Sequence, residues 1–420
     1  MQPPQWNALQ SDLAQLDPAD PQYAAQAVER LLAAGRAAGA SDIHLQPAAD
    51  ALELKFRLDG VLQAVARLPL GLAPNVVARL KVLAELLTYR TEIPQEGRIR
   101  QDSSDVEMRL STFPTLYGER AVVRFFGRGG RYERLDELGL PQDIRSALGR
   151  LLGETAGAIL ISGPAGSGKT TTAYACLREL ARQGGNRSLV SLEDPIEVAV
   201  PGVAQSQVNA PAGLDLATGL RFWMRQDPEV ILVGEIRDRA TAEAAFQASL
   251  TGHLLLSTFH AGSAAEALGR LLDMGIEPYV LRSSLLAILS QRLPRRLCHC
   301  ARPSDDPGAR LGLPIRRAMV PVGCQDCAGA GYLGRFLLVE MLSLRGGDCA
   351  GVPGGAELGR ALLARADTAV LERLAVRSGM TSRWHRAVEA AETGLTSPAE
   401  IRRLLGLAAV PSAEVECLSE

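Results

Sequence analysis

The 420-residue chain is longer than most single domains, so two or three domains are expected. Its 47% apolar and 22% charged residues are typical of a folded globular protein, and its formal net charge of −2 argues against a general attraction to nucleic acid or anionic lipid. The N-terminus has no secretory signal and no run of 18 apolar residues occurs, so we expect a cytoplasmic protein without a membrane-spanning helix.

The first part of the chain predicts an α+β domain. Residues 1–21 are rich in Pro and Gln and are expected to be flexible. Within 22–128, a helical period in "YAAQAVERLLAAGRAAGA" precedes alternating apolar and polar residues in "SDIHLQP" and "LELKFRLDGVLQAVARL", where Asp59 and Gly60 predict a hairpin turn. A helix is expected around "NVVARLKVLAELL", and alternation returns in "GRIRQDSSDVEMRLSTFPTLYGERAVVRFF".

After an expected linker at 129–139, the pattern changes to strands that alternate with helices. Four nearly continuous apolar runs, "GAILISG", "SLVSLED", "PEVILVGE" and "GHLLLSTFH", are typical of a parallel sheet that is covered on both faces. We therefore predict an α/β domain over 140–345. A second linker is expected at 346–355, and the composition of 356–420, rich in Ala, Leu, Arg and Glu, predicts a helical C-terminal region.

The segment "GPAGSGKT" at 163–170 matches G-x-x-x-x-G-K-[ST] between a predicted strand and a predicted helix. Its backbone N–H groups are expected to surround the β-phosphate of a nucleotide, while Lys169 reaches the β/γ oxygens and the Thr170 hydroxyl holds Mg²⁺. A tight turn without a ligand is the alternative. The expected nucleotide-binding residues of this loop are Gly163, Pro164, Ala165, Gly166, Ser167, Gly168, Lys169, Thr170 and Thr171.

Acidic residues follow two of the predicted strands. In "PEVILVGEIRD", Gly234 stands where a phosphate-loop enzyme usually has Asp, so Glu235 is expected to act on the Mg²⁺ shell, through water. In "LEDPIE", the carboxylates of Glu193, Asp194 and Glu197 are candidates to bind the nucleotide or to orient the attacking water. Their spacing alone does not decide which one does so, and a turn with solvated acids fits the same pattern.

Two histidines bracket one predicted core strand in "TGHLLLSTFHAG". A neutral imidazole at His253 or His260 is able to sense a γ-phosphate by hydrogen bonding. A structural role fits these histidines equally well, because lone histidines are more often structural than catalytic.

The motifs occur together and in order. "GPAGSGKTTT", "EDPIE", "RQDPEVILVGEIRD" and "TGHLLLSTFH" resemble the Walker A, Asp box, Walker B and His box of the secretion ATPase superfamily, which includes type II secretion ATPases, type IV pilus extension and retraction ATPases, and competence relatives. The resemblance extends over roughly residues 22–405, because further similarity occurs in "ASDIHLQP", "FRLDGVL", "PQEGRIR", "LSQRL" and "GYLGRFLLVEML". The resemblance implies a RecA-like P-loop ATPase domain, a smaller PAS-like α+β domain before it, a zinc-knuckle insertion at 295–330 and a helical C-terminus.

The resemblance also implies roles for the acids and histidines. Glu197 would be the catalytic glutamate that activates water, and Glu235 the Walker B residue that acts with Mg²⁺. His260 and His253 would sense the nucleotide state and contact the neighbouring half of the site. A Gly-Glu pair in place of the usual Asp is normal in this family.

Arg109 and Arg124 match the family's arginine fingers on the first domain. Without the resemblance, arginines on a solvated strand face would be the default in a chain so rich in Arg. Guanidinium charge stabilises a transferring phosphoryl group, so the match is physically reasonable. The family's architecture implies a homo-hexameric ring at the inner membrane, which passes motion to a platform protein and contacts the cytoplasmic domain of a membrane-anchored secretion component.

Four of the seven cysteines lie within 30 positions and resemble a two-knuckle zinc site, which is carried by type II secretion and pilus extension ATPases and generally absent from retraction ATPases. The first pair, Cys298 and Cys300, is one residue closer than the usual Cys-x-x-Cys, so His299 is an alternative ligand. Unmetallated thiols are the alternative to structural Zn²⁺. The second pair is Cys324 and Cys327.

We therefore expect an ATPase that uses ATP and Mg²⁺ to drive type II secretion, with pilus or competence filament extension as the alternative. A nucleic-acid translocase would need basic channel surfaces and stacking aromatics, and the chain has only 4% aromatic residues. A scaffold that only binds nucleotide is disfavoured by the intact Lys169, Glu197 and Glu235. Larger family members begin with an additional domain that this chain is expected to lack, which leaves its docking surface open.

Overall fold

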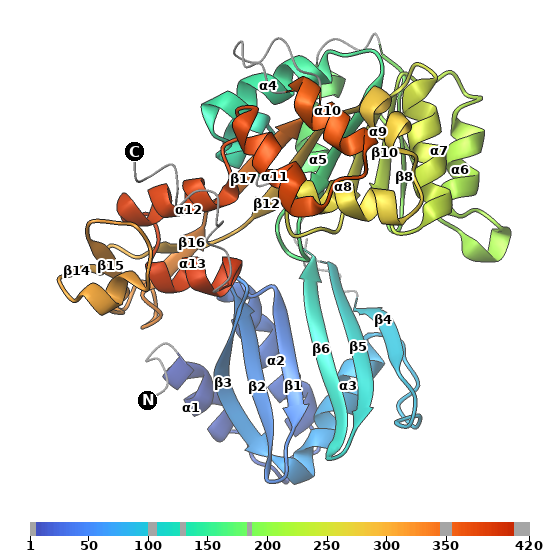
Figure 1. The fold of residues 1–420 in the computed structure, drawn as a ribbon. Helices are drawn as coiled ribbons and strands as arrows, with labels where there is room; N and C mark the ends of the chain where they lie inside the picture. The colour runs from blue at the N-terminus through green and yellow to red at the C-terminus, as the bar shows by residue number, and fades with distance from the viewer. Residues whose placement is uncertain (1–5, 100–106, 127–131, 183–186, 345–354, 407–420) are drawn as a thin grey trace. The chain divides into compact units, whose positions relative to one another are not determined.

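The computed structural model describes residues 6–99, 107–126, 132–182, 187–344 and 355–406 (Figure 1). The chain divides into two compact units. The first unit contains residues 1–130 together with 295–302 and 320–334, and the second contains 131–294, 303–319 and 335–420.

The first unit is built on a six-stranded sheet in the order β3-β2-β1-β6-β5-β4, in which every neighbouring pair is antiparallel. The predicted hairpin is confirmed, because Leu58 pairs with Val61 and both turn residues, Asp59 and Gly60, have positive φ. Its elements are α1 (Asn7–Ala14), α2 (Tyr23–Ala37), β1 (Asp42–Pro47), β2 (Ala51–Leu58), β3 (Val61–Pro69), α3 (Ala73–Leu83), β4 (Gln95–Ile99), β5 (Glu107–Thr115) and β6 (Gly118–Phe126).

The N-terminal segment differs from its expected flexibility. Residues 7–14 form helix α1, and the ring of Trp6 meets Phe56 of β2 edge-on, with centroids 5.2 Å apart. Trp6, Leu9, Leu13 and Leu16 are all buried in the core of the first unit. Their spacing of three and four residues is that of an amphipathic helix face, which the Pro- and Gln-rich composition conceals.

The second unit contains a seven-stranded sheet in the order β17-β12-β7-β11-β10-β8-β9. The four predicted strands β7, β8, β10 and β11 are present and parallel, and only β17 runs antiparallel to its neighbour β12. The strands are β7 (Gly157–Ser162), β8 (Leu189–Glu193), β9 (Ala204–Gln207), β10 (Val230–Glu235), β11 (Leu254–Phe259), β12 (Leu285–Arg292) and β17 (Leu338–Ser343). The mixed α/β class that the sequence predicts is therefore confirmed.

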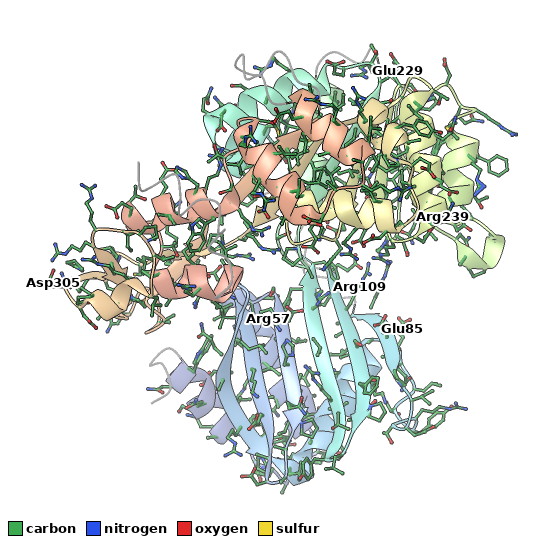
Figure 2. The ribbon with its side chains drawn as sticks, in the orientation of Figure 1. Arg57, Glu85, Arg109, Glu229, Arg239 and Asp305 are labelled. Atoms are coloured by element: carbon green, nitrogen blue, oxygen red, sulfur yellow. The ribbon has the colours of Figure 1, made fainter. Side chains whose placement is uncertain are left out.

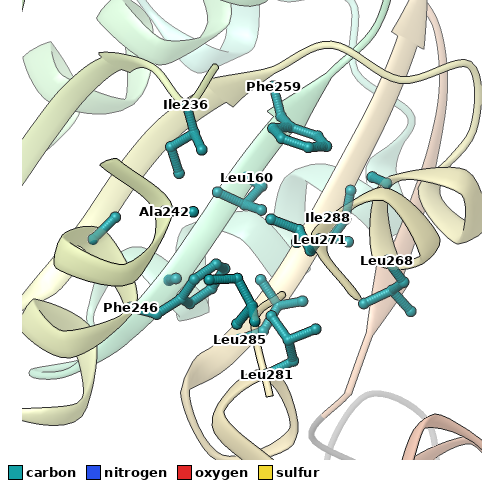
Figure 3. Packing of buried hydrophobic residues seen from close by; sticks show 14 of the residues in the cluster. Leu160, Ile236, Ala242, Phe246, Phe259, Leu268, Leu271, Leu281, Leu285 and Ile288 are labelled. Atoms are coloured by element: carbon teal, nitrogen blue, oxygen red, sulfur yellow. The ribbon is translucent and has the colours of Figure 1, made fainter. Parts of the chain in front are cut away.

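Helices cover both faces of this sheet, as the continuous apolar strands predict. Along β7, Leu160 contributes to the core beneath α7 and α8, whereas Ile159 and Ile161 contribute to the core beneath α4 and α5. Figure 3 shows the first of these cores, with Phe246 and Phe259 among the aliphatic side chains. The helices before β12 are α4 (Gln142–Leu152), α5 (Lys169–Arg182), α6 (Leu216–Trp223), α7 (Arg239–Leu250), α8 (Ala264–Asp273) and α9 (Pro278–Ser284).

The connecting and C-terminal segments refine the expected boundaries. Within the expected linker 129–139, the described part contains a 3-10 helix, Leu135–Leu138, with Leu135 buried in the second unit. The linker expected at 346–355 lies outside the described residues except for Gly355, where α10 begins. The C-terminal helices are α10 (Gly355–Leu363), α11 (Thr368–Arg377), α12 (Arg383–Glu392) and α13 (Pro398–Leu405).

Both cysteine pairs group with the first unit, in 295–302 and 320–334, whereas residues 303–319 between them group with the second unit. The short strands of this segment are β13 (Arg295–Leu297), β14 (Arg302–Ser304), β15 (Ala318–Val320) and β16 (Tyr332–Arg335). The backbone N–H of Gly334 donates to the Asp59 carboxylate of the β2–β3 turn at 3.0 Å, which is a contact that sequence spacing does not reveal. Over the described ranges, no helix combines the length and the apolar character that crossing a bilayer requires.

Candidate functional site

The parallel strands of the second unit bring most of the candidate residues to one edge of the sheet. Ser162 at the end of β7 pairs with Phe259 at the end of β11, and the N–H of Gly163 donates to the Phe259 carbonyl at 3.3 Å. His260 therefore follows β11 directly beside the start of the loop 163–170. Because β10 and β8 continue the same parallel arrangement, their acidic ends reach this edge too.

The loop 163–170, called the cradle below, is a tight backbone turn built around three glycines. Gly163, Gly166 and Gly168 all have positive φ, at 150°, 73° and 86°. A Cβ on Gly163 would overlap the Ser167 hydroxyl and the carbonyl oxygen of Gln291. The Ser167 hydroxyl is buried and has no hydrogen-bond partner among the described residues. Narrow backbone space and an unpartnered donor fit a phosphate group held by backbone N–H groups at the start of α5.

Lys169 and Glu235 face this cradle as the opposite charges expected of a nucleotide site. The Lys169 ammonium donates to the carbonyls of Gly163 at 2.9 Å and Pro164 at 3.0 Å. Burial lowers the pKa of Lys169, the Glu235 carboxylate acts against that shift, and the charge of Arg292 adds to it. Glu235 also accepts from Arg237 at 2.6 Å, and Thr170 begins the helix beside Lys169.

The glycine at 234 has a steric cause. A Cβ at this position would lie 3.3 Å from the Cα of Glu193 on the neighbouring strand, closer than side chains usually approach. The pairing of β10 with β11 also shifts between Val233 and Glu235, and Thr258 donates from its hydroxyl to the Gly234 carbonyl at 2.7 Å. An aspartate at 234 would have to push the two strands apart, so the acidic function falls to Glu235 instead.

The three acids after β8 separate into different environments. Glu193 is buried, and its carboxylate accepts from the hydroxyls of Tyr174 and of Ser191, the latter at 2.6 Å, and from Gln205 at 3.2 Å. These three hydrogen bonds fix the Glu193 carboxylate at the end of β8. Asp194 and Glu197 are exposed at the same edge of the sheet.

Tyr174 of α5 is a site residue that sequence reasoning missed. Its hydroxyl accepts from the backbone N–H of Glu197 at 3.2 Å and of Val198 at 3.4 Å while it donates to Glu193. Burial and the bond to Glu193 raise the pKa of Tyr174 strongly, so the hydroxyl stays protonated. No motif marks this role, since it depends on one helix reaching a turn 23 residues further along the chain.

The two histidines lie at opposite ends of β11. His260 is exposed beside the loop 163–170, and its carbonyl accepts from Arg270. His253 lies before β11, and its Nδ1 lies 2.9 Å from the Ala248 carbonyl near the end of α7. A strand of six residues spans about 20 Å, so His253 lies away from the loop of its own chain. Of the two histidines expected to sense the nucleotide state and to contact the neighbouring half of the site, His260 lies beside the loop 163–170 of its own chain and His253 does not.

Arg109 and Arg124 lie in one row across the face of the first unit's sheet that α2 and α3 leave uncovered. Arg98 pairs with Arg109, which pairs with Arg124, which pairs with Asp42 of β1. Figure 2 labels Arg57, which continues the row on β2, and Arg109. A hollow of about 610 Å³ on this face is lined by ten residues: His44, Glu96, Gly97, Arg98, Arg109, Leu110, Ser111, Val122, Arg124 and Phe126.

Carboxylates and an aromatic ring orient the arginines of this row. The Arg124 Nε donates to Asp42, which is buried, at 2.8 Å, and the guanidinium of Arg109 lies 4.6 Å from the ring centroid of Phe126. Glu107 accepts from Arg109 at 3.3 Å. The row thus presents excess positive charge to solvent, which suits an anion.

The four cysteines converge on one point. Sulfur–sulfur distances are 3.7 Å for Cys298–Cys324, 3.8 Å for Cys300–Cys327 and 3.8 Å for Cys324–Cys327. Four thiolates around a tetrahedral Zn²⁺ at 2.3 Å would be about 3.8 Å apart, so the spacing fits the ion despite the short Cys-x-Cys pair.

The surroundings of the cysteines fit a metal site too. The N–H groups of Cys324 and Gly331 donate to the Cys327 sulfur at 3.1 and 3.2 Å. The side chain of His299, the alternative ligand, is 69% exposed and lies 3.4 Å from Asp326.

Comparison with known proteins places this architecture among secretion and pilus proteins. A family described as "Type II/IV secretion system protein" matches residues 18–401. The type IV pilus assembly ATPase PilB of Thermus thermophilus is 36% identical over 373 residues, which cover 86% of this chain and 41% of that protein. Type II secretion system protein E of Dickeya dadantii is 44% identical over 310 residues, which cover 72% and 62%.

A putative type II secretion system protein E of Escherichia coli is 40% identical over 374 residues, covering 87% of this chain and 73% of that protein. The chain thus spans less than two thirds of the Thermus and Dickeya proteins. Among solved structures, the Legionella pneumophila ATPase DotB superposes with a TM-score of 0.66 at 20% identity, over 94% of this chain and 98% of DotB. The pilus retraction motor PilT superposes with a TM-score of 0.59 at 22% identity, over 93% and 98%, and this likeness concerns the fold alone.

Proposed function

Because the chain belongs to the family of type II/IV secretion system proteins, we propose that it is a motor ATPase that hydrolyses ATP to drive pseudopilus assembly and protein export by a type II secretion system. The observation that carries this proposal is the cradle at 163–170 with Lys169, Glu235, Glu197 and His260 at the same edge of one sheet. Relatives named type II secretion system protein E at 44% and 40% identity support the secretion role.

Binding begins at the loop. The backbone N–H groups of 163–170 and the start of α5 hold the phosphates, and Lys169 moves from its loop carbonyls to the β/γ oxygens. The Thr170 hydroxyl and Glu235 would hold Mg²⁺, which supplies charge neutralisation at the phosphates. The surrounding domain is the RecA-like part of the fold.

Hydrolysis then depends on one carboxylate that follows β8 at this edge of the sheet. Glu193 is saturated by Tyr174, Ser191 and Gln205, whereas Glu197 is exposed at the same edge. We assign Glu197 as the base that orients and deprotonates water, with Asp194 beside it and His260 sensing the γ-phosphate.

The Glu197→Gln variant tests the hydrolytic function. Turnover should fall by about 10²-fold or more while ATP binding stays, because a general base is removed and the cradle is left intact. Phosphate release measures the loss of turnover, and an equilibrium titration with ATP shows separately whether binding is kept. Turnover equal to that of the unaltered chain would exclude Glu197 as the base.

Arg109 and Arg124 would act as arginine fingers on nucleotide held by a second copy, within a homo-hexameric ring. The row of arginines held in place by Asp42 and Glu107 supports this role. Mixing an Arg109→Gln chain with a Lys169→Ala chain should restore turnover, because each supplies what the other lacks. Absence of any restoration at concentrations where the unaltered chain is active would contradict sites shared between copies.

The cysteine cluster would hold one structural Zn²⁺ with Cys298, Cys300, Cys324 and Cys327 as its ligands. The thiol spacing of 3.7–3.8 Å supports four sulfur ligands, so His299 is not needed. The PAS-like description of the first unit belongs to the same proposal, as do the inner-membrane platform protein and the membrane-anchored component as partners. The identity of 36% to the pilus assembly ATPase PilB favours filament extension as the second candidate function.

A further inference from the structure

Strand β12 ends in Gln291 and Arg292 of the segment "LSQRL", and neither residue has a role in the proposed site so far. Gln291 is fully buried, and its Nε2 donates to the Ser167 carbonyl at 3.0 Å while its Oε1 accepts from the Thr172 hydroxyl at 3.2 Å. These two bonds fix the end of β12 against both the phosphate cradle and α5. The next residue, Arg292, is therefore held beside the cradle.

Arg292 has more donors than partners. Its Nη2 donates to the Gly262 carbonyl at 3.1 Å. Its Nε and Nη1 are buried and have no hydrogen-bond partner among the described residues. A buried charged donor without an acceptor is unfavourable, so this guanidinium fits a site in which an acceptor arrives with a ligand.

The charges around Arg292 indicate what kind of acceptor that is. Burial lowers the pKa of Arg292, with the neighbouring charge of Arg383 acting in the same direction and the carboxylates of Glu266 and Glu340 acting against it. Arg292 in turn contributes to the low pKa of Lys169. Two cations thus share a poorly hydrated space next to the cradle, and a polyphosphate would relieve their repulsion and supply oxygen acceptors.

The Gly262 carbonyl connects Arg292 to the turn that follows His260 and to the C-terminal helices. The same carbonyl accepts from Arg383, the first residue of α12. The buried carboxylate of Glu340 on β17 accepts from the N–H of Ala264 at 2.9 Å and from the N–H of Arg383 at 2.8 Å. The start of α8, the turn and the start of α12 are therefore joined through groups that Arg292 contacts.

We propose that Arg292 binds the terminal phosphate of the nucleoside triphosphate held at 163–170, and that its bond to Gly262 transmits the presence of that phosphate to the His260 turn and to α12. This inference rests on the proposed nucleotide-binding function and adds a phosphate contact from β12 to it. A triphosphate and a diphosphate differ in the one group that Arg292 would contact. Loss of Arg292 therefore affects ATP binding selectively.

Equilibrium titration of the full chain with fluorescent ATP and ADP analogues in the presence of Mg²⁺ tests this. For Arg292→Gln, affinity for the ATP analogue should fall about tenfold or more while ADP affinity changes less than about twofold, since one charge-assisted contact is lost only with the triphosphate. Arg383→Gln, which removes the other donor to Gly262, should preserve the ratio of the two affinities. Arg316→Gln, an exposed arginine paired with Glu392, is the inert control.

The titrations distinguish failure of the Arg292 proposal from failure of the nucleotide-binding proposal. Equal losses for ATP and ADP, or none for either, would assign Arg292 a structural role and overturn the proposal. An unaltered chain that binds neither analogue would contradict the nucleotide-binding function itself. If Arg292→Gln does not fold, Arg292→Lys serves instead, and the thermal shifts given by ATP and by ADP are compared. A preserved preference for ATP in that variant would also overturn the role, because a single ammonium lacks the fork of donors.

Discussion

Gln291 donates from its side-chain amide to the carbonyl of Ser167, 124 positions earlier in the chain, at a distance of 3.0 Å. This bond ties strand β12, which lies between β17 and β7, to the cradle at 163–170, and the Thr172 hydroxyl of α5 donates to the same side chain. The shape of the cradle is thus set both by its own glycines and by an amide from a distant strand.

Replacing this amide by an apolar side chain of similar length should weaken both the fold and nucleotide binding. Gln291→Met leaves the Ser167 carbonyl and the Thr172 hydroxyl without this partner, at a cost of about 1–3 kcal/mol for buried groups. ATP affinity should fall with it, because the loop loses its support. Urea denaturation and ATP titration measure the two effects. Gln247→Met, at an exposed position of α7, is the matched control. Equal stability of the two variants would contradict a stabilising role for the Gln291 hydrogen bonds.

Glu193 and Glu197 should separate into a structural and a chemical acid. Glu193→Gln disturbs three hydrogen bonds in a buried place and is expected to lower the free energy of unfolding by about 1–3 kcal/mol. Tyr174→Phe should give a smaller loss of the same sign. Glu197→Gln, at an exposed position, should leave stability unchanged. Denaturation followed by tryptophan fluorescence in a Trp6→Phe background reports on the second unit alone.

The opposite result would exchange the roles of Glu193 and Glu197. A Glu193→Gln chain as stable as its parent but unable to hydrolyse ATP would move the chemistry from Glu197 to Glu193. The hydrogen bonds to Tyr174 would then serve catalysis and not the fold.

Gly234 should tolerate no side chain. Gly234→Ala places a Cβ about 3.3 Å from the Glu193 Cα, so β8 and β10 must separate, at an expected cost of about 1–3 kcal/mol. Because Glu235 follows directly, its position should shift and ATP turnover should drop as well. Gly149→Ala in α4, where nothing lies within 4 Å of the added Cβ, should instead be neutral or stabilise by up to about 1 kcal/mol. Matching effects of the two substitutions would refute the steric reason for glycine.

The parts of this site that sequence predicts are those encoded by local pattern. The spacing of glycines, lysine and threonine in 163–170 predicts the phosphate loop. Apolar runs such as "GAILISG" predict parallel strands, because both faces of such a sheet must be buried. The carboxyl ends of such strands then meet at one edge, which places Glu235 and His260 beside the loop. Local sequence is sufficient where the determining contacts are local.

What sequence did not reveal depends on contacts between distant segments. The run "LLAILSQR" of β12 is apolar without a period that separates strand from helix, and the segment "LSQRL" by itself assigns no role to Gln291 or Arg292. Spacing alone does not separate Glu193 from Glu197; the resemblance implies that Glu197 is the base, and the burial of Glu193 against Tyr174 adds a physical difference between them. Composition alone does not predict helix α1, because the Pro and Gln residues of 1–21 outnumber the buried apolar residues of the segment 6–16.

Lowering the pH should destabilise the first unit partly through His44. Burial lowers the pKa of His44, helped by the charge of Arg57, and Arg120 donates to its Nδ1 at 3.1 Å. The folded chain therefore binds less proton at His44 than the unfolded chain, so stability rises with pH up to the ordinary histidine pKa and falls as the pH drops below it. His44→Asn, which keeps an acceptor for Arg120, should flatten this part of the pH dependence.

The measurement needs a signal from the first unit alone. Trp6 supplies it when Trp223 and Trp384, which both lie in the second unit, are changed to Phe. Urea midpoints are compared between mildly acidic and neutral pH. A His44→Asn chain that loses as much stability on acidification as its parent would show that other groups carry the dependence.

Removal of metal should loosen the cysteine segment and, with it, the hold of Gly334 on the Asp59 turn. One Zn²⁺ per chain is expected by elemental analysis, because four sulfurs stand at tetrahedral spacing. A chelator should therefore loosen β13 and β16, which pair with each other beside the cysteines, since metal binding and folding are coupled in such small sites. Hydrogen exchange at the Gly334 amide, which donates to Asp59, reports whether the effect reaches the β2–β3 hairpin.

Two variants decide which residues hold the metal. Cys298→Ser should lower the zinc content and the stability as the chelator does, whereas His299→Ala should change neither, because the His299 side chain is 69% exposed, with its Nδ1 3.6 Å from the Cys298 sulfur, and four thiols already surround the site. Zinc lost in His299→Ala but retained in Cys298→Ser would mean that the short Cys-x-Cys pair binds through the imidazole, as the sequence alone allowed. If the Gly334 amide still exchanges slowly after complete removal of zinc, its hydrogen bond to Asp59 does not depend on the metal.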